Sequence, residues 1–463
     1  MMQIFKISLA LLSFFFGLSA HATYKLPAYN QVVLDNGLTL FLMEQHEVPL
    51  IDISIVTKVG AINDGKLAGL SQITAKNLTL GTQSLTKLAL DKEIDFIGAN
   101  IDSSAGAEFS TINASFASKD QIKMLTLLRD MTIAPVFNPE EFSKYKKRHL
   151  LQLEQAKESP RAVINDYFNR LLFGENGYGS LVSGEKTSVD KVQLADIKKH
   201  HKKWFQPSNS AIVMVGDFDS KKVQQQLSKL FANWQDTQKL PKALTAEKLT
   251  TKKANVLLVN KEDAGETTFA IGGAGIARNN PDRVGVSVIN TILGGRFTSW
   301  LNDALRVNAG LTYGARSRFN AYSRDGSFAI STFTKTATTV EAIDLALATY
   351  NKLWQQGIDQ PTLDSAKAYV KGQFPPKFET SSQLAALLVN MYGYGFDESY
   401  INTFEQQVNA LTIAKTKELI KNYFPKDNLQ YVLIGKASEI RDQVAKYGEI
   451  KETDINDEMP LIN

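Results

Sequence analysis

Metal chemistry in this chain can rest only on histidines and acids, because its 463 residues include five histidines and no cysteine. Zinc sites use thiolate, imidazole or carboxylate ligands, and two helical histidines chelate one ion when they are spaced i, i+4. The adjacent His200 and His201 point to different sides of a predicted helix, so they are not such a pair. His46 falls in a predicted loop and His149 in a basic helix. We expect surface histidines and no catalytic zinc site in this chain.

Arg306 and Tyr313, seven positions apart, could also do chemistry, but their spacing alone favours a structural role. The first is predicted at the end of a helix and the second at the start of a strand. A guanidinium and a phenol at such positions can donate hydrogen bonds to a developing oxyanion or to a peptide carbonyl. The alternative is structural, because a helix-terminal arginine often caps carbonyl groups or pairs with an acid, here Asp303.

Residues 1–22 have the pattern of a secretory signal peptide. Lys6 is their only charge, an apolar stretch at 7–18 follows it, and Ala20-His21-Ala22 fits a small-x-small cleavage site. A membrane anchor is the alternative, but a spanning helix needs about 20 apolar residues. We therefore expect export, with the bacterial periplasm as the destination, secretion as the alternative, and no transmembrane span in the mature chain. The lack of cysteine indicates stability from core burial without disulfides.

Charge is close to balanced, with a net value of +4 at pH 7 for the whole chain. Nucleic-acid binding is typical of proteins with a strong basic stripe, so we expect no nucleic-acid partner. The glycine-rich run 272–275 lacks the Lys-Ser/Thr of a phosphate loop, and a strand edge or turn is expected there.

Two halves of the chain repeat one order of predicted elements, which indicates a duplicated domain. The first half is predicted to contain a hairpin at 35–37, strands at 38–43, 50–59 and 210–216, and helices at 68–77 and 221–231. The second is predicted to contain strands at 255–260, 267–273 and 429–435, and helices at 284–293, 298–306 and 438–447. Partly segregated strands and helices favour an α+β fold. We predict two homologous sandwich domains of mixed β-sheet flanked by helices, 23–234 and 254–463, joined by a polar linker at 235–253.

Short motifs along the chain resemble the pitrilysin/insulinase family of zinc metallopeptidases in its short two-domain form. In the first half they include Leu34-Asp35-Asn36-Gly37-Leu38, Gly60-Ala61, Gly69-Leu70, Leu80-Gly81-Thr82, Pro135-Val136-Phe137, Ser159-Pro160, Tyr178-Gly179, Gly184-Glu185, Trp204-Phe205-Gln206-Pro207-Ser208-Asn209 and Val215-Gly216-Asp217. In the second half they are Gly294-Gly295, Leu305-Arg306 and Gly310-Leu311-Thr312-Tyr313. Each motif is weak alone, and their shared order over almost the whole mature chain is specific. The resemblance implies two sandwich domains in a clam-shell arrangement.

Active family members carry H-x-x-E-H on the helix after the Gly-Leu motif, with two zinc-binding histidines, a general base and a distal glutamate ligand. The resemblance places this motif on Gln72, Ala75 and Lys76. Gln is a poor zinc ligand, Ala cannot accept a proton and Lys repels a cation. Glu154 is the expected remnant of the distal ligand. The resemblance therefore implies a degenerate zinc site and no metal in this chain.

In the family, the arginine and tyrosine that match Arg306 and Tyr313 reach a zinc domain and hold the substrate. The resemblance implies a zinc-less subunit of a heteromeric metallopeptidase, inactive alone, that supplies this substrate-binding pair. A homologous partner with H-x-x-E-H would bring the zinc, and the two chains would hydrolyse peptides. The alternative is a non-enzymatic peptide-binding or scaffold protein of the cell envelope. An independent peptidase with a relocated site is a third hypothesis, which no histidine cluster supports.

Overall fold

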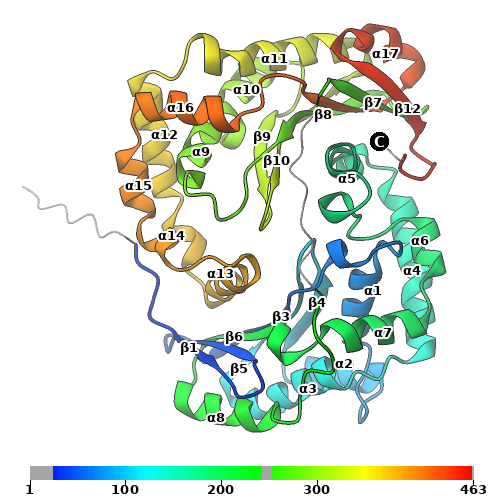
Figure 1. Cartoon of the computed structure of the whole chain (residues 1–463), viewed down its shortest axis with the longest axis vertical. Coiled ribbons are helices and arrows are strands. Elements are labelled where there is room, and N and C mark those ends of the chain that lie inside the picture. Colours follow the sequence, from blue (N-terminus) through cyan, green and yellow to red (C-terminus); the bar gives the residue numbers. More distant parts are fainter. Residues whose placement is uncertain (1–23, 242–251, 461–463) are drawn as a thin grey trace, which may run out of the picture.

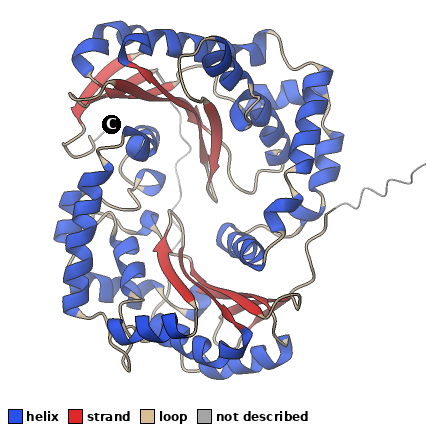
Figure 2. Ribbon diagram, turned by 180° about the vertical axis from the view of Figure 1, so that it is seen from behind, coloured by secondary structure: helices blue, strands red, loops and turns tan. Residues whose placement is uncertain are grey.

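Two six-stranded mixed β-sheets, each flanked by helices, face one another in the chain (Figure 1 and Figure 2). The structure is a computed structural model that describes residues 24–241 and 252–460. The predicted signal peptide and the middle of the predicted linker lie outside the described residues. The two mixed sheets with their helices confirm the predicted α+β class.

The first sheet has the spatial order β1-β2-β6-β3-β5-β4. The neighbours β2 and β6 are parallel, and all other neighbours are antiparallel. The predicted hairpin joins β1 to β2, with Gly37 at a φ of 89°, a conformation that glycine adopts without steric cost. The strands are β1 (Asn30–Val33), β2 (Thr39–Glu44), β3 (Leu50–Thr57), β4 (Asn100–Ala105), β5 (Ser110–Ala117) and β6 (Ser210–Gly216).

The second sheet repeats this pattern in five strands, ordered β7-β11-β8-β10-β9, and adds β12 as a parallel neighbour of β7. Its strands are β7 (Asn255–Asn260), β8 (Glu266–Ala274), β9 (Arg316–Ala321), β10 (Gly326–Lys335), β11 (Gln430–Gly435) and β12 (Glu449–Asp454). Gly272 lies inside β8 between β10 and β11, so the predicted strand edge or turn is wrong. A Cβ on Gly272 would lie 1.8 Å from Phe328 O, and the glycine therefore serves close strand pairing.

Helices form the outer layers of both halves. In the first half, α1, α3 and α8 share one apolar core with Leu40, Ile53 and Met214 of the first sheet. The helices of this half are α1 (Leu70–Asn77), α2 (Lys87–Phe96), α3 (Gln121–Ile133), α4 (Pro139–Ala156), α5 (Pro160–Phe173), α6 (Lys186–Lys191), α7 (Leu194–Trp204) and α8 (Ser220–Leu230). Those of the second are α9 (Arg283–Asn290), α10 (Trp300–Asn302), α11 (Thr339–Gln355), α12 (Gln360–Gly372), α13 (Ser381–Tyr394), α14 (Ser399–Asn402), α15 (Phe404–Ala410), α16 (Ile413–Tyr423) and α17 (Ala437–Val444).

Each half also places one helix on the sheet of the other half, and these two helices lie between the sheets (Figure 1). Helix α13 packs on β3 and β6, and α5 packs on β8 and β11. Both faces of each sheet are thereby covered, which agrees with the continuous apolar runs of β6 and β11. The halves share apolar cores: Phe41 and Val213 cluster with Leu388 of α13, and Tyr167 of α5 clusters with Val432.

Two predicted helices of the second half are shorter than expected. Helix α9 ends at Asn290 and continues as a π-helical turn, Thr291–Gly295, and α10 is followed by a second one, Asp303–Asn308. Gly294 lies against β9, where a Cβ would come within 2.2 Å of Ser317 N. Such turns are rare and occur often at functional sites. One of the two carries Arg306.

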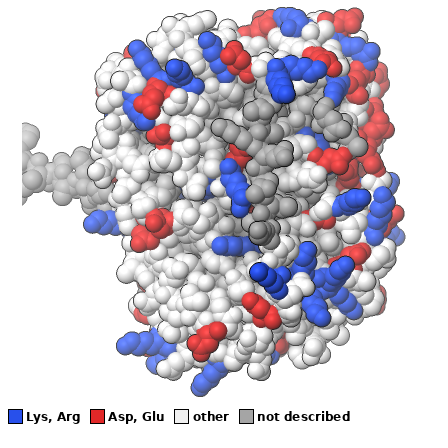
Figure 3. Space-filling model, viewed as in Figure 1, with Lys and Arg blue, Asp and Glu red and all other residues white. Residues whose placement is uncertain are grey.

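The outer surface is polar and of mixed sign. Figure 3 shows lysines and arginines interspersed with acids over the face in view, with the basic side chains densest toward its lower right. Across residues 24–241 and 252–460, no helix combines the length and apolar character needed to cross a bilayer. The absence of a nucleic-acid partner stays a prediction.

Candidate functional site

On helix α1, two of the positions that match the zinc motif, Gln72 and Lys76, contact strand β4. Gln72 Oε1 accepts a hydrogen bond from Ala105 N at 2.7 Å. Lys76 Nζ donates to Asp102 Oδ1 at 2.7 Å, and Ala75 is fully buried. The side-chain oxygen of Gln72 therefore already accepts a hydrogen bond. The ammonium group of Lys76 pairs with the Asp102 carboxylate, which is then not available to a metal. These residues do not fit a zinc ion.

The acid expected as a remnant of the distal ligand is engaged as well. Glu154 on α4 forms an ion pair with Lys186 Nζ at 2.5 Å and is half exposed. In the part of the chain that the structure describes, no three histidine, aspartate or glutamate side chains are grouped to hold a metal ion. The matching positions on α1 thus make structural contacts, a hydrogen bond, an ion pair and apolar packing, in place of metal ligation.

Of the four histidines among the described residues, two are buried and a third is partly covered, which contradicts the expectation of surface positions. His149 Nε2 donates to Ser183 O at 2.8 Å, and His201 Nε2 donates to Thr132 O at 2.8 Å. His200 contacts Ser71 of α1, whereas His46 is exposed and pairs with Asp217 and Glu44. A neutral imidazole with a carbonyl or hydroxyl partner is compatible with burial, and that partner is not visible in the local sequence.

A buried polar network fixes the start of α1. Asp64 accepts from Gly69 N at 3.0 Å, Ser71 N at 2.9 Å and Ser71 Oγ at 2.5 Å. His200 Nε2 lies 3.0 Å from Ser71 Oγ and, since that hydroxyl donates to Asp64, the imidazole is the donor. The order of contacts is acid, serine, histidine, so the acid does not orient the histidine as in a catalytic triad. The network holds the Asp64 carboxyl group at a helix N-terminus, a structural role.

His200 makes folding stability fall in acid. Burial lowers the pKa of His200 to about 3, below the value of 6.5 for a free histidine. The unfolded state therefore binds a proton first, and stability is lost as the pH falls below about 6.5, by about 2 kcal/mol at pH 5 for this group. We expect His200→Gln, whose amide can still donate to Ser71, to flatten the fall in free energy of unfolding between pH 7 and pH 5.

The control for this prediction is His46→Gln, because exposed His46 has its pKa raised by Asp217 and Glu44 and stabilises the folded state at low pH. Burial raises the pKa of Asp64 to about 7, which opposes the His200 effect but is common to both variants. Urea denaturation at each pH measures the difference. Equal acid sensitivity of His200→Gln and the unaltered chain would contradict a buried neutral histidine.

A metal site can be built on α1 by two substitutions. We expect Gln72→His with Lys76→His to place two imidazoles at i, i+4, while Asp102, released from Lys76, supplies a carboxylate. Zinc at about 30 times its dissociation constant should then add about 2 kcal/mol to the free energy of unfolding. Thermal denaturation with zinc and with a chelator measures the gain. Gln72→His alone is the control, and a zinc-dependent shift in the unaltered chain would contradict the degenerate site.

Arg306 and Tyr313 lie on the surface of the second half. The Arg306 guanidinium stacks on Phe297, 4.7 Å from the ring centroid, and forms no ion pair within the described residues, Asp303 included. Tyr313 is 83% exposed and stacks on Phe333, 6.2 Å between centroids. The structural alternative of an arginine paired with Asp303 is therefore wrong. Both polar groups are left available to a ligand or partner.

The loop that joins the pair is held in place, and its surroundings are apolar. Leu311 N donates to Leu305 O at 2.8 Å, and Thr332 Oγ1 donates to Gly314 O at 2.9 Å. Phe297 and Val307 beside Arg306 are 66% and 63% exposed. These side chains and the π-helical turn under Arg306 were not singled out from the sequence. The sequence signal for this apolar surrounding was Val307, which directly follows the Leu-Arg motif.

The chain does not bring its two candidate groups together. Helix α1 packs on α7 and β4 in the first half, whereas α10 and the π-helical turn of Arg306 pack on α11 and β9 in the second. Figure 1 shows α1 and α10 in opposite halves of the molecule. The degenerate zinc positions of α1 and the pair Arg306 and Tyr313 therefore lie in different halves of the chain.

Comparison with known proteins agrees with this geometry. Two family profiles match: insulinase (peptidase family M16) over residues 41–186 and peptidase M16 inactive domain over residues 191–370. The chain is 26% identical over 444 residues to the "Non-peptidase homolog YmxG" of Helicobacter pylori, which covers 94% of this chain and 98% of that protein. It is 23% identical over 418 residues to "Zinc protease PqqE" of the same organism, which covers 88% of this chain and 93% of that protein.

Among solved structures, the crystal structure of a peptidase M16 inactive domain from Pseudomonas fluorescens has the same fold. Its TM-score is 0.82 at 23% identity, covering 88% of this chain and 98% of that one. The two profiles together cover strands of both sheets, and the 463 residues contain no H-x-x-E-H. The chain belongs to the insulinase (peptidase M16) family, as a homologue without the family's zinc-peptidase motif.

Proposed function

We propose that this chain is the zinc-less subunit of a heteromeric peptidase and that it supplies Arg306 and Tyr313 to a homologous zinc-bearing partner. The partner would carry H-x-x-E-H and the zinc ion, and the substrate would be a peptide. The chain would act after export to the bacterial periplasm, as its first 22 residues predict. By itself it would hydrolyse nothing.

The observation that carries the proposal is the unpaired, exposed Arg306 beside exposed Phe297 and Val307. The contact of an exposed arginine with an aromatic ring adds little stability in water. Contiguous exposed apolar side chains mark interaction sites. Arginine and tyrosine are also enriched where protein surfaces meet. A partner that covers Phe297 and Val307 would exclude water from Arg306 and strengthen its hydrogen bonds.

The chemistry of the pair follows from its donors. A guanidinium offers a planar fork of N–H groups, and a phenol offers one O–H. Aimed at a peptide carbonyl, both can stabilise the negative charge that develops on its oxygen during hydrolysis. The hydrogen bonds that fix loop 311–314 hold the two donors before substrate arrives, so little conformational entropy is lost on binding.

The relatives add a separate argument. Helicobacter pylori has both a "Non-peptidase homolog YmxG" and a "Zinc protease PqqE", and this chain resembles each over most of its length. A non-peptidase homologue beside a zinc protease of one fold is the arrangement that a divided site requires.

The test starts with a pull-down of the tagged mature chain from its own cells, with bound proteins identified by mass spectrometry. A stoichiometric partner that carries H-x-x-E-H is expected. The two purified chains should then hydrolyse a quenched fluorescent peptide together, and neither should do so alone. Recovery of the chain alone or with unrelated envelope proteins would refute the heteromer and favour a non-enzymatic peptide-binding or scaffold role.

A further inference from the structure

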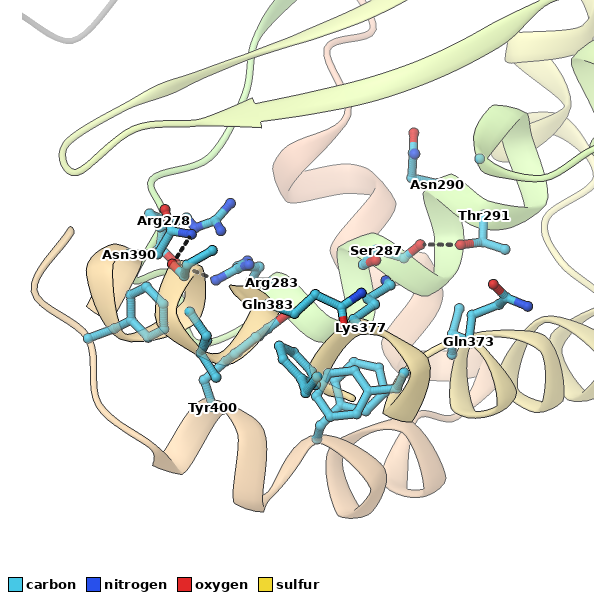
Figure 4. Close-up of a pocket in the computed structure, with 18 of the residues that line it drawn as sticks. Arg278, Arg283, Ser287, Asn290, Thr291, Gln373, Lys377, Gln383, Asn390 and Tyr400 are labelled. Carbon is cyan, nitrogen blue, oxygen red and sulfur yellow. Dashed lines mark hydrogen bonds between the residues drawn. The ribbon is translucent and has the colours of Figure 1, made fainter. Parts of the chain in front are cut away.

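A cavity of about 620 Å³ lies within the second half, between α9, α12, α13 and the short helices that follow (Figure 4). Its lining includes neither Arg306 nor any residue of α1, and its volume falls in the range of about 300–1,000 Å³ typical of ligand sites. Cations, amides and aromatic rings line most of it, together with a few hydroxyl and aliphatic side chains. The proposed function uses none of them.

The lining contains three cations, Arg278, Arg283 and Lys377, and no acid. None of the three forms an ion pair within the described chain, and Arg278 Nε is buried without a hydrogen-bond partner. Burial lowers the pKa of Arg283. Partial burial and the nearby positive charge of Arg283 both lower the pKa of Lys377. Arg278 and Arg283 are half-buried and Lys377 is exposed. Cations gathered in one hollow without a counter-charge attract an anion, so a site of this kind is completed by one.

The nearest acids have other partners. Asp282, next to Arg283, is bound by Lys415 Nζ at 3.2 Å and Tyr423 Oη at 2.8 Å. Glu108 accepts from Tyr178 Oη and Ser323 N. Asp397 lines an adjoining hollow on the far side of the two arginines and accepts from Ser399. Among residues 24–241 and 252–460, no carboxylate forms an ion pair with the three cations of the cavity.

Aromatic contacts hold the arginines in position. The Arg283 guanidinium lies 4.1 Å from the Tyr400 ring centroid, and that of Arg278 lies 5.2 Å from the centroid of Tyr394. Figure 4 shows both arginines beside Asn390 at one end of the cavity, with Lys377 and Gln383 near its middle. The ring side chains of the wall are Tyr369, Phe374, Phe378, Phe396, Tyr400 and Phe404.

We infer that this cavity binds an acidic segment of a peptide, with a carboxylate on Arg278 and Arg283 and apolar side chains on the rings. A guanidinium fork matches a carboxylate, and Gln373 and Gln383 can bind peptide amides. A small inorganic anion would leave most of the aromatic wall without contact. The anion site rests on the cavity alone, and the choice of a peptide rests on the proposed function.

The test uses the mature chain without any partner, so that its outcome is independent of peptidase activity. A fluorescein-labelled peptide of alternating Glu and Leu is titrated by fluorescence anisotropy, beside the same peptide with Gln in place of Glu. We expect the acidic peptide to bind at least about 10-fold more tightly, and Arg278→Gln with Arg283→Gln to remove that difference. Arg148→Gln is the matched control, because Arg148 is also an arginine stacked on a tyrosine ring.

A folding control accompanies the binding test. Loss of two mutually repelling cations should leave the thermal midpoint of the double variant at or above that of the unaltered chain. Lys377→Glu is a single substitution that should weaken binding of the acidic peptide and leave binding of the Gln peptide unchanged. Equal binding of the two peptides, or unchanged binding by the double variant, would overturn the inference. Displacement of the peptide by an equal concentration of tripolyphosphate would overturn the peptide assignment.

Discussion

Arg306→Ala should lower kcat/KM for peptide hydrolysis by the reconstituted pair of chains by about 10²- to 10³-fold, the effect of removing one oxyanion donor. The substitution removes the guanidinium and leaves Phe297 and the π-helical turn in place. Tyr313→Phe should cost about 10-fold, because it keeps the ring stacked on Phe333 and removes one hydroxyl donor. Steady-state kinetics with a quenched fluorescent peptide measures both.

Arg148→Ala is the matched control, since Arg148 is exposed on α4 and stacks on Tyr145. It should leave kcat/KM unchanged. Analytical ultracentrifugation of each variant with the partner separates catalysis from assembly. Full activity of Arg306→Ala in a fully assembled pair would remove this residue from the proposed site, and loss of assembly would assign it to the interface instead.

Leu388→Ala on α13 should lower the free energy of unfolding by about 2–5 kcal/mol, the range for a fully buried leucine. The apolar cluster that contains Leu388 includes Phe41 and Val213 of the first sheet and Ile271 of the second. A cavity in this cluster therefore weakens both halves. Guanidinium denaturation should show one transition, shifted to lower denaturant as a whole.

Leu151→Ala on α4 is the control for the same chemical change in an exposed helical position. Its effect should stay within about 0.5 kcal/mol. The contradicting result would be two separate transitions, of which Leu388→Ala shifts only one. The halves would then unfold independently, and the packing of α5 and α13 on the opposite sheets would not couple them.

Much of the fold was predictable from local patterns. Asn36-Gly37 between apolar runs predicted the hairpin, and the uninterrupted apolar run 210–216 predicted a fully buried strand. The acidic and serine residues at 217–220 are typical of a helix start before the predicted helix 221–231, and the Asp219 side chain accepts from Lys222 N at 3.0 Å. Each signal involves residues a few positions apart, so no knowledge of distant segments was needed.

The local patterns failed where distant segments meet. Gly272 serves the pairing of β8 with β10, although its neighbours in sequence resemble a turn. His149 and His201 can be covered because backbone carbonyls 34 and 69 positions away accept hydrogen bonds from their imidazole N–H groups. The helices that carry Leu293 and Arg306 pass into π-helical turns. Helical periodicity in sequence does not distinguish the two kinds of helix.

The sequence by itself determined the chemistry that this chain lacks and the chemistry that it retains. The types of residues 72, 75 and 76 exclude the zinc-peptidase motif in any conformation, and the resemblance of the motifs around Arg306 and Tyr313 to the family singled out the other candidate pair. Only the tertiary structure decided that α13 covers the first sheet, that Arg306 lacks an ion pair, and that Arg278, Arg283 and Lys377 share one cavity. An apolar face or a charge is a local property, but its partner is chosen by the packing of segments up to hundreds of residues apart.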